Sequence, residues 1–87
     1  MAIELSTFYF FIVVNEYVGA CRDAPMDTIG QTYTGQGNDK YECLKQCAAT
    51  VSQFTGCAFG VTGKDCYVYT GRVARGDGNS DYICMKV

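Results

Sequence analysis

The sequence contains no histidine. Without histidine, a Ser–His or Cys–His nucleophile cannot be built, and general-base chemistry would depend on carboxylates alone. The acidic residues beyond position 20 are scattered over expected turns and helix caps. We therefore predict that the protein is not an enzyme and has no catalytic residues.

An excess of charge of one sign is also missing. Seven basic residues stand against nine acidic ones, and because Glu4 and Glu16 are the only charges before residue 21, the remainder balances at seven and seven. No basic run is present to neutralise phosphates, which is the interaction that dominates nucleic-acid binding. Nucleic acid is therefore not an expected partner.

Recognisable metal and redox motifs are absent as well. There is no Cys-x-x-Cys motif for disulfide exchange, and the spacing of Cys43 and Cys47, followed by singly spaced cysteines, does not match a zinc site. Asp77, Asn79 and Asp81 alternate as calcium ligands can, but the glycine and glutamate positions of a complete calcium loop are missing. We expect neither a metal nor a cofactor.

No apolar run approaches the ~20 residues that a membrane-spanning helix needs. The apolar run at residues 8–14 fits two interpretations. It is either part of a signal peptide, with Gly19 and Ala20 before Cys21 but Glu4 where a basic residue is usual, or a strand that is apolar on both faces.

We favour the strand, because aromatic and β-branched residues suit extended backbone. It would serve as an arm that docks into a neighbouring subunit by strand addition, unless it forms a central strand of its own domain. The candidate assembly residues are Phe8, Phe10, Phe11, Ile12, Val13 and Val14.

Cysteine, by contrast, is abundant, with six in 87 residues. So short a chain buries a limited apolar core, and an even number of cysteines indicates a disulfide framework formed in an oxidising compartment. We therefore expect an extracellular or cell-surface protein.

The local patterns predict an α+β fold. Asp39 and Glu42 have the spacing of a capping box, so a helix is expected from Lys40 to Ser52 or Gln53. The other expected elements are a short strand within residues 28–33, a hairpin of 57–61 and 66–69, a mobile loop over 70–80 and a last strand over 82–87.

The helix restricts the disulfide pairing. Cys43 and Cys47 lie one turn apart on the same helix face, with Cβ atoms about 5–6 Å apart, which exceeds the roughly 4 Å of a relaxed disulfide. Each must therefore bond to a hairpin cysteine, either Cys57 or Cys66, and both combinations remain open. The two remaining cysteines, at the ends of this region, then pair with each other.

Three segments resemble the PAN/Apple family, a module of extracellular adhesion, coagulation and growth-factor proteins. Residues 42–47 read Glu-Cys-Leu-Lys-Gln-Cys, residues 56–59 read Gly-Cys-Ala-Phe and residues 65–69 read Asp-Cys-Tyr-Val-Tyr. The resemblance covers residues 21–87 and implies a small disulfide-rich antiparallel sheet with one helix packed across it. It also implies the nested pairs Cys21/Cys84, Cys43/Cys66 and Cys47/Cys57.

The candidate ligand-binding residues come from this resemblance and from the loop that precedes the last strand. Five tyrosines could stack on sugar rings, as related glycan-binding modules would use them: Tyr33, Tyr41, Tyr67, Tyr69 and Tyr82. Aromatics at alternate strand positions, however, usually pack on the sheet. The loop carries the tripeptide Arg75-Gly76-Asp77, which resembles an integrin-type recognition sequence but also arises easily by chance. The candidates are Tyr67, Tyr69, Arg72, Arg75 and Asp77.

Two functions follow as hypotheses. The first is a structural subunit with an apolar arm (residues 1–20) and a PAN/Apple-like domain (residues 21–87) that forms a homo-oligomer, and head-to-tail docking that does not close would build a filament. The alternative is a secreted binding module for a glycan or protein ligand, with residues 1–20 as its signal peptide.

Overall fold

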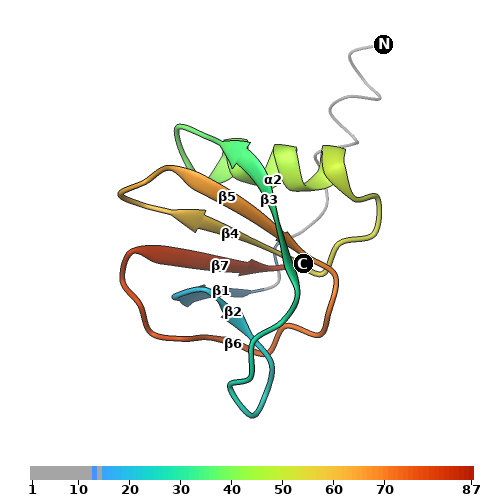
Figure 1. Cartoon of the computed structure of the whole chain (residues 1–87), viewed down its shortest axis with the longest axis vertical. Helices are drawn as coiled ribbons and strands as arrows, with labels where there is room; N and C mark the ends of the chain where they lie inside the picture. The colour runs from blue at the N-terminus through green and yellow to red at the C-terminus, as the bar shows by residue number, and fades with distance from the viewer. Residues whose placement is uncertain (1–12, 14) are drawn as a thin grey trace.

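A computed structural model describes residue 13 and residues 15–87 (Figure 1). Five antiparallel strands form the main sheet in the order β1-β7-β4-β5-β3, and helix α2 crosses one face of it. The prediction of a small disulfide-rich antiparallel sheet with a helix packed on it is confirmed. The elements of this layer are β1 (Asn15–Val18), β3 (Gln31–Gln36), α2 (Lys40–Thr50), β4 (Gly56–Gly60), β5 (Asp65–Tyr69) and β7 (Tyr82–Lys86).

Helix α2 begins at the expected cap. The Asp39 side chain accepts a 2.9 Å hydrogen bond from the Glu42 backbone N–H, and the Glu42 carboxylate accepts one of 2.9 Å from the backbone N–H of Asn38. The helix ends at Thr50, before the expected Ser52 or Gln53. The reason is that Val51 turns to extended backbone and packs against the core under α2.

The central strand β4 separates two apolar cores. Cys57 and Phe59 face α2, together with Val68 of β5 and Met85 of β7. Ala58 belongs to the core on the opposite face, which also contains Cys21, Tyr69, Val73 and Cys84. We call this opposite side of the sheet the helix-free face.

Three disulfides connect these layers, and all six cysteines are fully buried. Two bonds attach α2 to the sheet, one to β4 and one to β5, and the third attaches β2 (Cys21–Arg22) to β7. The pairs are Cys21–Cys84, Cys43–Cys66 and Cys47–Cys57, the same pairs that the PAN/Apple resemblance implies.

The sheet extends further toward the N-terminus than the expected domain start at residue 21. Strand β1 pairs with β7 from Asn15 to Val18, and Tyr17 packs against the core of the helix-free face. Val13 is half-buried against the core under α2. The other candidate assembly residues, Phe8, Phe10, Phe11, Ile12 and Val14, lie outside the described residues.

The segment expected to be a loop, residues 70–80, contains a short strand in its central part. Strand β6 (Arg75–Gly76) pairs there with β2 (Cys21–Arg22) in a second, small sheet. Backbone hydrogen bonds of 2.9–3.0 Å from residues 74, 77 and 78 hold this segment to residues 18–22. The expected strand at residues 28–33 also moves, because β3 runs from Gln31 to Gln36.

Candidate functional site

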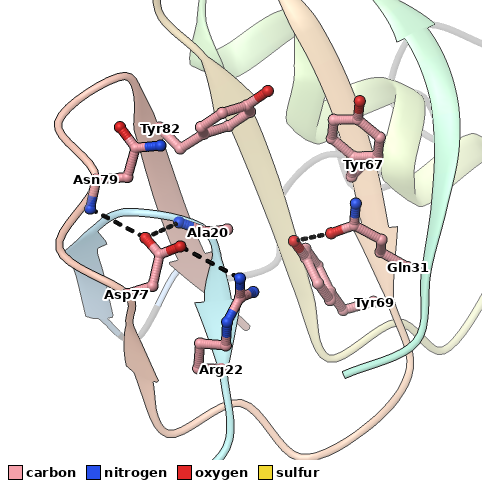
Figure 2. A pocket seen from close by; sticks show the side chains of 8 residues that line it. All are labelled: Ala20, Arg22, Gln31, Tyr67, Tyr69, Asp77, Asn79 and Tyr82. Carbon is pink, nitrogen blue, oxygen red and sulfur yellow. Dashed lines mark hydrogen bonds and ion pairs between the residues drawn. The ribbon is translucent and has the colours of Figure 1, made fainter. Parts of the chain in front are cut away.

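A pocket of about 220 Å³ opens on the helix-free face, between the main sheet and the small sheet (Figure 2). One wall comes from β3 and β5, the other from β2 and the turn after β6, and β7 contributes to the same opening. Its lining residues are Ala20, Arg22, Gln31, Tyr67, Tyr69, Asp77, Asn79 and Tyr82.

Small residues of β4 allow two tyrosine rings to meet at this pocket. Ala58 lies opposite Tyr67 of β5, and Gly60 lies opposite Tyr82 of β7. Because β4 separates β5 from β7, their backbones are about 10 Å apart. The two rings nevertheless lean over β4 until their centroids are 6.4 Å apart, at an interplanar angle of 54°.

The Asp65 carboxylate affects the phenol groups of both rings. The Tyr82 hydroxyl donates a 2.7 Å hydrogen bond to the Asp65 carboxylate, and mainly for this reason the pKa of Tyr82 rises to about 12. Hydrogen bonding to the same carboxylate is also the largest cause that raises the pKa of Tyr67. Both hydroxyls therefore stay protonated at neutral pH. A Cβ at Gly60 would lie 2.0 Å from an Asp65 carboxylate oxygen, so glycine leaves the space that this arrangement needs.

The opposite wall is an ion pair held by backbone groups. Arg22 Nη2 lies 3.2 Å from one Asp77 carboxylate oxygen, and the other oxygen accepts 3.0 Å hydrogen bonds from the backbone N–H groups of Ala20 and Asn79 (Figure 2). Arg22 also donates to the carbonyl of Cys21 at 2.9 Å. The charges of this wall therefore neutralise each other.

Tyr69 lies at the base of the pocket. Its side chain is fully buried, and its hydroxyl donates a 2.5 Å hydrogen bond to the side-chain oxygen of Gln31 (Figure 2). Burial is the main cause that raises the pKa of Tyr69. Tyr69 therefore supports Gln31 from below rather than offering its own ring to a ligand.

The structure brings together only some of the candidate ligand-binding residues. Tyr67 and Asp77 line the pocket, and Tyr69 closes its base. Arg72 and Arg75 are exposed but do not line it. Tyr82, one of the tyrosines expected to be able to stack on sugars, also lines the pocket. The sequence did not indicate Arg22, Gln31 and Asn79, because they reach the pocket only through the pairing of distant segments.

The tripeptide at residues 75–77 has a role inside the fold. Gly76 lies in β6, where a Cβ would be 2.1 Å from the carbonyl oxygen of Val18. The Asp77 carboxylate is occupied by Arg22 and two backbone N–H groups. The Asp77 carboxylate is therefore engaged within the fold.

The chemistry available in the pocket consists of hydroxyl, amide and guanidinium groups beside aromatic rings, which suits binding. Among residue 13 and residues 15–87, no cluster of metal-ligating side chains occurs, and no helix is long and apolar enough to cross a membrane. Three disulfides in so small a domain fit a secreted or extracellular protein. No protein-family model, curated protein or solved structure matches the chain.

Proposed function

We propose that the protein is a secreted binding module whose ligand is a glycan, and that the pocket on the helix-free face binds one saccharide unit. The observation that carries this proposal is the combination of two tyrosine rings with planar polar groups around one opening. A sugar ring presents C–H groups that pack on aromatic faces and hydroxyls that exchange hydrogen bonds with amides and guanidinium groups.

The charges around the pocket favour a neutral ligand. Arg22 is the only basic residue among the lining residues, and Asp77 already pairs with it. The Asp65 carboxylate accepts a hydrogen bond from Tyr82. A phosphate or sulfate group would therefore find no unpaired cation in the pocket, whereas neutral hydroxyls would find both donors and acceptors.

Binding to a panel of immobilised neutral and acidic oligosaccharides, followed by calorimetry on the sugars retained, tests this function. We expect neutral sugars to bind. Tyr82→Ala should lower the affinity about tenfold because the ring is lost, while Tyr82→Phe should keep most of it. The proposal is wrong if no sugar binds, or if Tyr82→Ala binds as well as the unaltered protein while remaining folded.

We also propose that the chain is a divergent member of the PAN/Apple family. The nested disulfides and the helix across an antiparallel sheet support this relationship. A crystal structure superposed on PAN/Apple domains tests it, and a different strand order in those domains would refute it.

A second candidate function is self-assembly through the N-terminal segment, including assembly into a filament. The observation that favours it is the position of β1, an edge strand that directly follows the apolar run at residues 8–14. Edge strands are sites where chains add to one another.

Light scattering of the full chain and of a variant lacking residues 1–12 tests this second function, since the variant keeps Val13 and β1. We expect the full chain to form oligomers and the shortened chain to be monomeric. The same oligomeric state in both would rule the function out. The mass of the native N-terminus shows in addition whether the segment is retained in the mature protein.

A further inference from the structure

A third tyrosine continues the aromatic surface of the pocket toward the sheet edge. Tyr33 of β3 lies directly opposite Tyr67 in the strand register, and their ring centroids are 5.6 Å apart. Tyr82 contacts Tyr67 from the other side, at 6.4 Å. We call these three residues the tyrosine row. It runs across the strands, from β7 over β4 and β5 to β3.

The outer end of the row lies outside the pocket. Tyr33 is not among the lining residues and is 56% exposed, although it sits beside the half-buried Tyr67. Cross-strand aromatic pairs stabilise a sheet through side-chain packing and burial. A ring that remains more than half exposed on an edge strand gains little from that effect, so it is available for a ligand.

The rings of the row are tilted relative to one another. The interplanar angles are 59° between Tyr33 and Tyr67 and 54° between Tyr67 and Tyr82. A single flat ligand cannot lie against all three faces at once. A chain of separate rings, joined by linkages that allow successive rings to rotate, can place one unit in the pocket beside Tyr67 and Tyr82 and the next unit on Tyr33.

We infer that the ligand is an oligosaccharide or polysaccharide chain, that the pocket binds one of its units, and that Tyr33 forms a second subsite for a following unit. This inference rests on the proposed glycan-binding function and extends it to ligand length and direction. The chain lies across the strands and leaves the protein at the β3 edge, where the main sheet ends.

Calorimetric titration with neutral oligosaccharides of increasing length, drawn from one series that binds, tests this inference. We expect affinity to increase from one unit to about two, one in the pocket and one on Tyr33, and then to level off. Tyr33→Ala should lower the affinity for the longer sugars about fivefold and leave the affinity for the single unit unchanged. Tyr33→Phe should bind like the unaltered protein.

Tyr41 supplies a matched control. It is 64% exposed and lies at the start of α2, away from the tyrosine row, so Tyr41→Ala should bind sugars of every length normally. If Tyr33→Ala has a much lower melting temperature, Tyr33→Thr replaces it, because threonine suits a strand and also lacks the ring.

The outcomes separate the two proposals. If no sugar binds, the proposed function is wrong and the inference with it. If sugars bind through Tyr82 but Tyr33→Ala has no length-dependent effect, the second subsite is wrong and the proposed function stands. An equal loss of affinity for the single unit and for the long sugars would also overturn the subsite, because Tyr33 would then act by shaping the pocket.

Discussion

At the scale of single residues, Asp65 determines how the pocket tyrosines are held. Its carboxylate accepts the hydrogen bond from Tyr82 and raises the pKa of both Tyr82 and Tyr67. Gly60 leaves the space for that carboxylate beside β4. Asp65 does not line the pocket, so it acts as a positioning residue.

This arrangement predicts a loss of stability at alkaline pH. The pKa of Tyr82 rises from 10.0 to about 12 on folding, so between these values the folded chain binds more protons than the unfolded chain. The stabilisation is complete below pH 10, and the free energy of unfolding should fall as pH rises from 10 toward 12. Denaturant unfolding across this range measures the fall.

In Asp65→Asn, the pKa of Tyr82 should return toward its ordinary value, because the negative charge is gone. Less stability should then be lost between pH 10 and 12 than in the unaltered protein. Asp27→Asn is the control, since Asp27 is exposed, does not line the pocket and makes no hydrogen bond to either tyrosine. Equal pH dependence in Asp65→Asn and the unaltered protein would contradict the assigned role of Asp65.

At the scale of elements, the small sheet of β2 and β6 builds one wall of the pocket. Its pairing places Arg22 near Asp77, although 55 positions separate them in the sequence. Close packing at Gly76 permits this, because β6 passes against the carbonyl of Val18 at the end of β1. The pocket therefore depends on a backbone contact between two short elements.

Gly76→Ala should disrupt this wall, because the new Cβ would lie 2.1 Å from the oxygen and 2.7 Å from the carbon of the Val18 carbonyl. Backbone atoms cannot move aside cheaply, so we expect a loss of about 2 kcal/mol in unfolding free energy. Gly30→Ala is the matched control, since a Cβ there meets no atom within 4 Å. Urea unfolding of both variants checks this, and equal stabilities would count against the close contact.

At the scale of the whole molecule, the disulfides close loops of very different length. The Cys21–Cys84 bond spans 63 positions in the sequence, whereas the Cys47–Cys57 bond spans only 10. In the chain-entropy model, a crosslink stabilises a protein by restricting its unfolded chain, and a longer loop gives the larger effect. The bond that closes the long loop joins β2, the second strand, to β7, the last strand.

Removing each of these two bonds by paired alanine substitutions should therefore have unequal effects. Cys21→Ala with Cys84→Ala should cost about 4 kcal/mol, and Cys47→Ala with Cys57→Ala about 3 kcal/mol. All four cysteines are fully buried, so the same atoms are removed from similarly buried sites. Urea unfolding under non-reducing conditions compares the two variants, and a larger loss for the short loop would disagree with the model.

Much of the local structure was predictable from the sequence. The capping pattern at Asp39 located the start of α2, and the apolar stripe with Cys43 and Cys47 identified the face that packs on the sheet. The two hairpin strands and β7 were also found, because their alternating side chains and turn residues are short-range signals. The end of α2 was missed, since Val51 leaves the helix to pack against the core.

The pocket was only partly predictable. Tyr67 and Asp77 stood out as an aromatic strand residue and as part of a tripeptide. Arg22 carried no local signal, because its role arises only when β2 pairs with β6. Tyr69 was a candidate because it lies two positions after Tyr67 on the same strand, but its ring is buried in the core of the helix-free face.

The sequence by itself determined the disulfide-rich character of the domain, its α+β class and the absence of histidine chemistry, because these depend on residue counts and short-range patterns. The tertiary structure decided that residues 15–18 join the sheet, that the tripeptide at 75–77 serves the fold, and that Tyr33, Tyr67 and Tyr82 form one row. The physical reason is that these three features depend on strand pairing between segments far apart in the chain. Short-range sequence patterns do not reveal which distant segments pair.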